Sequence, residues 1–362
     1  MRIAITGIRG IPANYGGFET FAEELAPRLA ARGHDVTVYG RSNNIKYDKK
    51  FYKGVRIRVL PTIPHKYLDT AAHTFFTMFD IIGRGYDAVL VCNAINSVWC
   101  LPMRMAGKRV CLNVDGLDRL RRKWNRLGRF MGLIGEAFAT VFPNDIITDA
   151  VVVQEYYLKR YGAKSAMIPY GVSAERADTT EALEKIGIKP DEYLLYVSRL
   201  EPENNAHVVV AAFDKVKTDK KLVVVGNAPY STDYIEKLKS TKDERIIFPG
   251  AVYGQGYREL QSHAFAYIQA TEVGGTHPAL LEGMALGNLV IANDTPEHRE
   301  VLADCGIYYE KNDADALAKA VQKIIENPAM RKNLREESLE RVREFYSWDI
   351  VTDRYEKLLL GL

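Results

Sequence analysis

Short apolar runs, many of them rich in β-branched residues, alternate with longer amphipathic stretches along the chain. The first unit predicts, in order, a buried strand over 2–6, a glycine-rich loop over 7–17, a helix over 18–32 and a strand over 35–39. Further strands are predicted over 55–60, 88–92, 109–114 and 146–149. Such alternation is typical of parallel βαβ units with helices on both faces of the sheet. The pattern therefore predicts a doubly wound α/β domain.

The same alternation begins again in the second half of the chain. Strands are predicted there over 193–198, 222–225, 245–248, 266–269, 289–292 and 307–309. Between the two series Pro and Gly interrupt the pattern, which places a hinge near Pro169–Ser173. The last two helices, 329–345 and 348–360, have no following strand, so we expect them to bridge the domains. The predicted organisation is an N-terminal domain over 1–168, a C-terminal domain over 169–328 and bracing helices over 329–362.

The composition is that of an ordinary globular protein, with 47% hydrophobic and 26% charged residues. Its 49 Lys and Arg against 46 Asp and Glu give a net charge of +3, too even for a protein whose main partner is nucleic acid. The four cysteines form no CxxC pair or zinc-like cluster, which favours a reducing compartment. No apolar run approaches the roughly 18 residues of a membrane span, and the N-terminus shows no signal-like segment. We expect a cytoplasmic protein, free or peripheral on the inner face of the cell membrane.

Two open α/β sheets are expected to face each other and to bind a ligand in one cleft, where strand carboxyl ends meet helix N-termini. On the N-terminal side, the loop 7–17 ends at a helix start. Gly16 and Gly17 let backbone N–H groups there approach a phosphate closely. The loop lacks the Gly-x-Gly-x-x-Gly and P-loop patterns, so a simple tight turn is the alternative.

The second phosphate candidate is Arg199, which follows a buried strand in the second series. Its guanidinium offers a fixed fork of donors that suits phosphate oxygens. The alternative is a surface arginine paired with Glu201 or Glu203. Asn204, next along the chain, is a further candidate contact to the ligand. The alternative is that Asn204 and Asn205 cap the following helix without any ligand.

The third candidate region is 271–285, a strand end, a Gly-Gly turn and a helix that opens with Pro. Gly275 and Thr276 offer backbone N–H groups to a ligand. Glu282 lies one turn into an otherwise apolar helix, where its carboxylate can accept two hydroxyl hydrogen bonds, as a ribose diol supplies. The alternative is a solvated Glu282. His277 lies in the same turn, where sugar contact and a structural use are both open.

Together these residues resemble the retaining GT-B glycosyltransferases of the large sequence family that includes sucrose synthases and many bacterial surface-polysaccharide enzymes. The resemblance covers nearly the whole chain and rests on Gly16-Gly17-Phe18-Glu19, on 32–38, on 198–200 and on 278–285. It implies an α/β fold of two facing Rossmann-like, doubly wound domains with C-terminal helices bridging them.

The resemblance also implies roles for individual residues. Glu282 matches the ribose ligand, Arg199 a diphosphate ligand, and Gly17 a backbone contact to the diphosphate. The Gly275-Thr276 turn matches the part that holds the sugar or distal phosphate.

Two departures from the family pattern stand out. The first glutamate of the usual Glu-x7-Glu pair is replaced by Gly274, with Glu272 nearby but out of register. The lysine often found five residues after the strand-end arginine is Asn204. We hypothesise that Arg9, in the opposite domain's loop, replaces that missing cation.

Four short motifs carry a finer resemblance: 15–20, 115–118 with Lys123 and Trp124, 202–205 and 274–276. They resemble a subgroup made up largely of rhamnosyl- and related transferases of capsule and O-antigen assembly. Asp115, at a strand end where many relatives have a cleft histidine, is a candidate for hydrogen bonding a donor or acceptor hydroxyl. Capping of the helix that follows is the alternative for Asp115.

The segment 104–129 is strongly basic, with nine Lys and Arg against two Asp and with apolar residues interleaved. It suits an anionic membrane surface or a lipid-diphosphate acceptor, and a merely solvated basic helix is the alternative. Nucleic acid is not expected, because no recognition motif accompanies the segment. Asp313 and Asp315 fit an Asp-x-Asp metal signature by letters, but they open a helix and are interpreted as an N-cap, so no metal is expected.

The resulting expectation is a glycosyltransferase that moves a sugar from a UDP- or dTDP-linked donor, dTDP-rhamnose among them, to a hydroxyl of a lipid-linked oligosaccharide in surface-polysaccharide synthesis. The resemblance implies retention of configuration, and no metal or other cofactor is expected. Two alternatives stay open: a GT-B nucleotide-sugar epimerase, and a non-catalytic nucleotide-sugar-binding protein.

Overall fold

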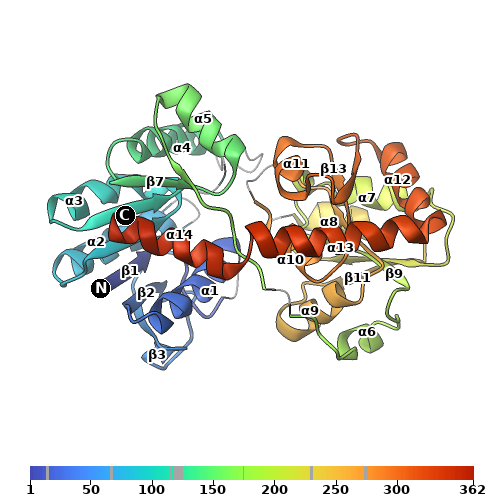
Figure 1. Cartoon of the computed structure of the whole chain (residues 1–362), viewed down its shortest axis with the longest axis horizontal. Helices are drawn as coiled ribbons and strands as arrows, with labels where there is room; N and C mark the ends of the chain where they lie inside the picture. Colours follow the sequence, from blue (N-terminus) through green and yellow to red (C-terminus); the bar gives the residue numbers. More distant parts are fainter. Residues whose placement is uncertain are drawn as a thin grey trace. The chain divides into compact units, whose positions relative to one another are not determined.

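The computed structural model describes residues 1–13, 16–65, 68–114, 116, 125–173, 175–228, 231–272 and 276–362. The chain forms two compact units (Figure 1). Unit 1 contains Met1–Gly171 and Trp348–Leu362, and unit 2 contains Val172–Ser347. Each unit has one predominantly parallel sheet with helices on both faces, so the α/β class predicted from the sequence is confirmed.

The sheet of unit 1 has eight strands in the order β3-β4-β2-β1-β5-β6-β7-β8. All its pairs are parallel except β3 with β4. The strands are β1 Arg2–Thr6, β2 Asp35–Arg41, β3 Phe51–Tyr52, β4 Val55–Leu60, β5 Ala88–Cys92, β6 Arg109–Asn113, β7 Asp145–Thr148 and β8 Ala166–Met167. Because the strand order reverses between β1 and β5, their carboxyl ends form the switch point where open α/β sheets bind ligands.

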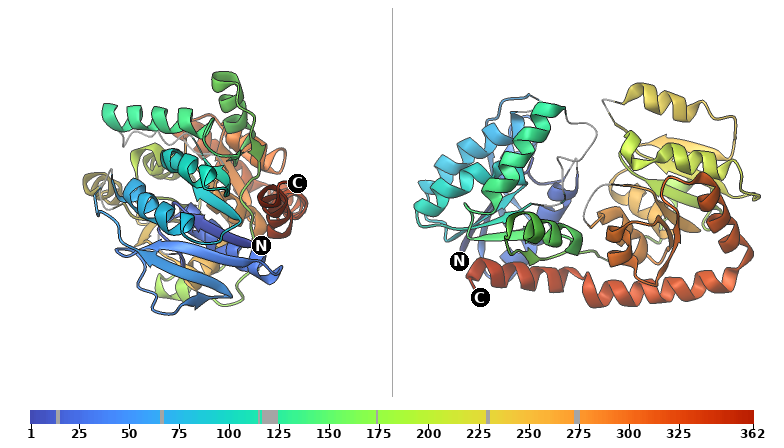
Figure 2. Two further views of the ribbon diagram at one scale, coloured as in Figure 1. Left: turned by 90° about the vertical axis from the view of Figure 1, so that its left-hand side faces the viewer. Right: turned by 90° about the horizontal axis from the view of Figure 1, so that it is seen from above.

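The helices of unit 1 form two layers around its sheet (Figure 2). One face has a core built with α2 Asp69–Ile82, α3 Cys100–Met105, α4 Arg126–Ala139 and α5 Val151–Tyr161, together with the 3-10 helix η1 Ala94–Trp99. The other face has α1 Gly17–Ala31 and the last helix, α14 Trp348–Leu360. The Phe21 and Tyr355 rings join these two helices with centroids 5.1 Å apart. The C-terminal helix therefore completes the core of unit 1.

The sheet of unit 2 has six parallel strands in the order β11-β10-β9-β12-β13-β14. They are β9 Tyr193–Val197, β10 Lys221–Val225, β11 Ile246–Gly250, β12 Ala266–Gln269, β13 Leu289–Asn293 and β14 Gly306–Tyr309. Here the strand order reverses between β9 and β12, and the carboxyl ends of these two strands form the switch point of unit 2.

The helices of unit 2 also lie on both sides of its sheet. The main apolar core lies under α7 Ala206–Phe213, α8 Thr232–Lys239 and α12 Ala314–Glu326. A second group of packed helices is α9 Gly254–Ser262, α10 Pro278–Ala285 and α13 Pro328–Phe345. The remaining helices are α6 Glu181–Lys185, η3 Pro202–Asn204 and α11 Pro296–Leu302.

The chain passes from one unit to the other twice, after Gly171 and after Ser347. The first passage lies within the segment predicted as a hinge, Pro169–Ser173. In unit 2 the two passages are joined side by side, because the Val172 N–H donates to the Tyr346 carbonyl at 2.8 Å. Helix α13 belongs to unit 2 and α14 to unit 1. The bridging role predicted for these two helices, and a cleft shared by the two units, stay predictions.

Candidate functional site

Arg199 lies at the carboxyl edge of the sheet in unit 2, two residues after β9. Its carbonyl accepts hydrogen bonds from the Asn204 side-chain amide at 2.5 Å and from the Ser198 hydroxyl at 3.0 Å. The Tyr196 hydroxyl in turn donates to the Asn204 carbonyl at 2.5 Å. The buried Asn204, a candidate ligand contact from the sequence, thus holds the backbone from which Arg199 projects.

The Arg199 side chain is exposed. Among the described residues it forms no ion pair with Glu201 or Glu203, the partners considered in the sequence-based alternative. Instead, one carboxylate oxygen of each glutamate is buried without a hydrogen-bond partner in the described part of the chain. The Arg199 guanidinium is therefore available to an external anion.

Glu282 lies on α10, which follows β12 across the switch point of unit 2. The side chain is half-buried, and one of its carboxylate oxygens accepts a hydrogen bond from the Tyr257 hydroxyl of α9. Gln261, one turn further along α9, donates to the same hydroxyl at 3.1 Å and is bonded to Asn288 at 3.1 Å. Burial, reinforced by the Glu282 charge, raises the pKa of Tyr257 well above its usual value. Tyr257 consequently stays protonated and fixes the Glu282 carboxylate.

Tyr257 and Gln261 were not singled out in the sequence. They are polar residues four positions apart, so they share one face of a helix. The spacing predicts a shared polar face of a helix, but it does not identify the residue that this face contacts.

Glu272, just after β12, ties the two sides of the switch point in unit 2 together. Its carboxylate accepts from the Asn205 amide at 2.9 Å and lies 3.7 Å from the Lys311 ammonium. Asn205 also donates to the Ala270 carbonyl at 3.0 Å. Asn205 is the residue at the N-cap position of α7 but forms no side-chain cap, and its side-chain NH2 group donates across the switch point.

The turn before α10 is described only in part. Thr276 is buried, and the His277 ring lies 5.1 Å from the ring of the fully buried His298. Gly274 and Gly275 lie outside the described residues, and so does Asp115 of unit 1. The roles inferred for them from the family resemblance stay predictions.

In unit 1, the glycine loop begins at the switch point between β1 and β5. Gly7 has a φ of +87°, and a Cβ added there would lie 2.3 Å from the Cys92 carbonyl oxygen at the end of β5. A side chain at this position would therefore meet both backbone strain and a steric clash. Gly7 lets the two strand ends approach each other.

Two carboxylates of α1 hold this loop. The Arg9 N–H donates to Glu19 at 2.9 Å, and the Ala13 N–H donates to Glu23 at 3.0 Å. Burial raises the pKa of Glu19, and the nearby Arg9 and Arg41 oppose that shift. Two N–H groups of the loop are thus already engaged by the protein itself. Glu19 belongs to the recognised Gly-Gly-x-Glu motif, but sequence analysis assigned it no role.

Gly16 and Gly17 lie at the start of α1. The Gly16 carbonyl accepts from the N–H groups of Glu19 and Thr20 at 3.1 Å each, which begins the helix. An anion contact at Gly16 or Gly17, and the proposed cationic role of Arg9, stay predictions.

The basic segment 104–129 is divided in its use. Three of its cations donate to backbone carbonyls of unit 1. Arg104 donates to the carbonyls of Val141 and Pro143. Lys108 donates to the Arg84 carbonyl, and Arg109 donates to the Leu358 carbonyl. Arg126 and Arg129 are exposed on α4. Residues 117–124 lie outside the described part of the chain. Within the described residues no helix is long and apolar enough to cross a membrane.

Asp313, the first residue of the Asp-x-Asp sequence, caps helix α12. One Asp313 oxygen accepts from the N–H groups of Asp315 and Ala316 at 2.8 and 2.9 Å, at the start of α12. The N-cap interpretation is confirmed. The described residues contain no group of His, Cys, Asp and Glu that is suited to holding a metal ion.

Two known protein families together match most of the chain. Residues 15–176 match Glycosyltransferase Family 4, and residues 178–341 match Glycosyl transferases group 1. Phosphatidyl-myo-inositol mannosyltransferase from Mycolicibacterium smegmatis is 25% identical over 351 residues, 93% of this chain and 88% of the relative. The N-acetylgalactosamine-N,N'-diacetylbacillosaminyl-diphospho-undecaprenol 4-alpha-N-acetylgalactosaminyltransferase of Campylobacter jejuni is 25% identical over 183 residues. That match spans 49% of each chain, about half the length of the relative.

Solved structures with low sequence identity share the architecture. Sucrose-phosphate synthase from Thermosynechococcus elongatus aligns with a TM-score of 0.85 at 20% identity and covers 99% of this chain and 98% of its own. The Anabaena protein Alr3699/HepE, solved in complex with UDP-glucose, aligns with a TM-score of 0.80 at 14% identity and covers 100% of both chains. These likenesses confirm a fold of two Rossmann-like α/β units.

Proposed function

Because this chain belongs to the group 1 glycosyltransferases of the GT-B fold, we propose that it transfers a sugar from a nucleoside diphosphate sugar to a hydroxyl group of a lipid-linked saccharide. Two relatives support a lipid-linked acceptor, since their names specify phosphatidyl-myo-inositol and a diphospho-undecaprenol saccharide. The Anabaena neighbour was solved with UDP-glucose, which supports a UDP-linked donor. A dTDP-linked donor rests on the subgroup resemblance. Rhamnose is the sugar that the subgroup resemblance favours.

The observation that carries the proposal is the pair of groups at the switch point of unit 2. Arg199 is an exposed cation without a carboxylate partner in the described residues, and Glu282 is a carboxylate held by Tyr257. The two residues follow the adjacent strands β9 and β12, where α/β sheets bind nucleotides. In this proposal Arg199 binds the diphosphate and Glu282 accepts hydrogen bonds from the ribose hydroxyls.

We propose that transfer retains configuration and requires no metal. Arg199 and the positive end of the α10 dipole stabilise the charge that develops on the leaving diphosphate. The departing phosphate oxygen takes the proton of the acceptor hydroxyl on the face where the new glycosidic bond forms. No protein nucleophile is needed in such a step.

The test is to incubate the purified protein with UDP-, dTDP- and GDP-sugars and lipid-linked acceptors, and to identify the product and its anomeric configuration by mass spectrometry and NMR. Arg199→Ala and Glu282→Gln should each lower donor turnover at least tenfold, because each removes a charged contact of about 1.5–3 kcal/mol. Tyr257→Phe should mainly raise the donor KM, because it frees the Glu282 carboxylate without removing it.

Matched controls are Arg258→Ala and Glu192→Gln, which alter exposed side chains of the same unit. Near-wild-type kinetics for both Arg199→Ala and Glu282→Gln would contradict the assigned site. Loss of activity in EDTA that added metal restores would contradict the metal-free mechanism. Release of free nucleoside diphosphate only when acceptor is present would exclude the epimerase alternative, and tight donor binding without transfer would favour a non-catalytic protein.

A further inference from the structure

Unit 2 has a strongly basic cavity of about 260 Å³. Four cationic side chains line it, Arg176, Arg331, Lys332 and Arg335. Glu336 is the one acidic side chain among the described residues that line the cavity. The cavity therefore has a large excess of positive charge.

The cavity lies at the amino ends of the strands of unit 2. Gly287, in its wall, lies two residues before β13, and the Phe265 carbonyl bound by Arg331 lies directly before β12. Arg199 and Glu282 follow the carboxyl ends of β9 and β12, so they lie at the opposite edge of the same sheet. The cavity is separate from the proposed donor site.

Two guanidinium groups of the cavity converge on Gly287. A Cβ added to this glycine would lie 3.3 Å from Arg176 Nη1 and 3.8 Å from Arg335 Nη2. Arg331 and Arg335 are also four residues apart on α13, a spacing at which like charges destabilise a helix. The fold thus assembles like charges, and Asp191 forms an ion pair with Arg331 alone among the arginines of the cavity within the described residues.

The hydrogen-bond partners of the three arginines differ. Arg331 is paired with Asp191 and bonded to the Phe265 carbonyl at 2.8 Å. Arg176 is held by the carbonyls of Leu286, at 2.6 Å, and of Ser262, so its fork is fixed while its charge is not neutralised. Arg335 has no hydrogen bond or ion pair within the described part of the chain. Burial lowers the pKa of Arg335, and the charges of Arg331 and Arg176 lower it further.

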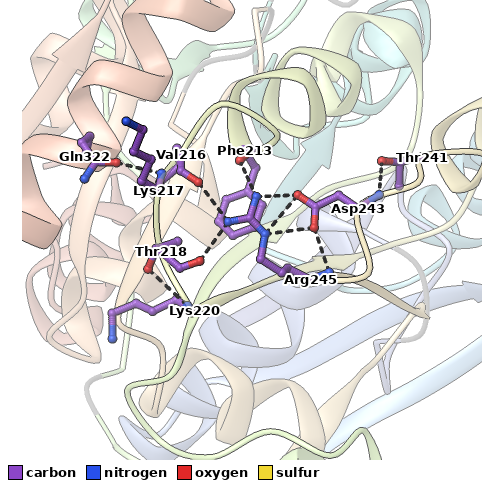
Figure 3. A network of polar contacts seen from close by, with 9 residues as sticks. All are labelled: Phe213, Val216, Lys217, Thr218, Lys220, Thr241, Asp243, Arg245 and Gln322. Carbon is purple, nitrogen blue, oxygen red and sulfur yellow. Dashed lines mark hydrogen bonds and ion pairs between the residues drawn. The ribbon is translucent and has the colours of Figure 1, made fainter.

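Arg245, in the same unit, serves as a comparison for Arg335, because the protein itself supplies partners for its charge and its hydrogen-bond donors (Figure 3). Its guanidinium forms a two-pronged pair with Asp243 and donates to the carbonyls of Phe213, Val216 and Thr218. The hydrogen bonds with Asp243 raise its pKa, although burial opposes them. Arg335 has the opposite shift, which is consistent with a missing counter-ion.

We propose that this cavity is a second anion site, which binds a phosphate monoester group between Arg176 and Arg335. Guanidinium groups match the geometry of phosphate oxygens. The carbonyl contacts of Arg176 fix its guanidinium and use one N–H of each terminal nitrogen, which leaves three of its five N–H donors for a ligand. At roughly 30 Å³ per water molecule, the cavity has room for a phosphate group and part of its substituent. The ligand neutralises the charge at Gly287 and joins Arg176 to α13.

The test measures binding of inorganic phosphate and of glycerol phosphate to the whole protein by calorimetry and thermal shift, at an ionic strength matched with NaCl. The wild type and Arg199→Ala should bind both saturably, and Arg335→Gln should bind at least tenfold more weakly. Arg343→Gln, an exposed position on the same helix, is the matched control and should bind like the wild type.

A third arm uses phosphatidylcholine vesicles with and without phosphatidic acid, which carries the same monoester in a lipid headgroup. Vesicle binding that requires phosphatidic acid and Arg335 would assign the site to a lipid, whereas binding of glycerol phosphate alone would assign it to a soluble ligand. Wild-type affinity in Arg335→Gln, loss in Arg199→Ala instead, or no binding to any probe would overturn the proposal. If Arg335→Gln does not fold, Lys332→Glu at the exposed rim replaces it and should weaken binding several-fold.

Discussion

His73 in unit 1 and His298 in unit 2 are both fully buried. The His73 ring contacts the Gly40 carbonyl at 3.0 Å, and the His298 ring contacts the Asn293 carbonyl at 2.9 Å. Burial lowers the pKa of each imidazole to about 4. Both rings are therefore neutral at pH 7 and donate a single N–H to a backbone carbonyl.

These histidines should make each unit sensitive to mild acid. An unfolded histidine binds a proton near pH 6.5, whereas these two resist protonation until about pH 4. Their stabilising effect is complete above pH 6.5 and is lost as the pH falls toward 4, about 2 kcal/mol for each at pH 5. Denaturation at pH 7.5 and 5 should show a smaller pH-dependent loss for His298→Gln than for the wild type. An equal loss in both proteins would disprove the effect of His298.

At the scale of the element, Arg245 holds together the C-terminal end of α7 and the loop that leads to β10 (Figure 3). Its half-buried guanidinium satisfies three carbonyls and neutralises Asp243. Removal of one partner from such a network leaves polar groups and a charge without compensation.

We therefore expect Arg245→Ala to lower the free energy of unfolding of unit 2 by about 2–4 kcal/mol. Arg299→Ala is the control, because Arg299 forms a comparable two-pronged pair with Asp294 but is exposed to solvent. Exposed pairs contribute about 0–1 kcal/mol, so this variant should be nearly neutral. Urea denaturation measures the free energy of unfolding of both variants. Equal losses of this free energy would show that the carbonyl contacts of Arg245 add little.

At the scale of the whole molecule, unit 1 has an exposed apolar stripe on α4. Leu127, Phe130 and Met131 are 62%, 58% and 46% exposed, at positions that share one helix face. Arg126 and Arg129 flank them. An apolar face with adjacent cations suits the surface of an anionic membrane, where a lipid-linked acceptor is found.

We expect the protein to bind vesicles that contain phosphatidylglycerol, and to bind them less as salt rises. Leu127→Ser with Phe130→Ser should weaken co-sedimentation several-fold while activity on a water-soluble acceptor persists. Phe51→Ser is the control, since Phe51 is 50% exposed on the edge strand β3 of the same unit. Vesicle binding that is unchanged in the α4 variant would contradict this surface assignment.

The alternation of apolar and polar residues was sufficient to predict the fold class and most of the sheet. Strands predicted over 2–6 and 88–92 coincide with β1 and β5, because burial imposes a pattern that can be read locally. The strands β3 and β8 were missed, since two residues are too few to show a period. The position of Arg199 after a buried strand and of Glu282 in an apolar helix made both residues candidates, and motif resemblance led to the family.

Tertiary structure alone decided how those candidates are supported. Tyr257, which fixes Glu282, lies 25 residues before it, and nothing in the spacing links the two. Asn204 proved to hold the Arg199 backbone, a contact that depends on the exact path of the loop after β9. The basic cavity draws Arg176 together with α13, far apart in the chain. Local periodicity reports which face of an element is buried, but which side chains meet across elements depends on packing that only the folded chain specifies.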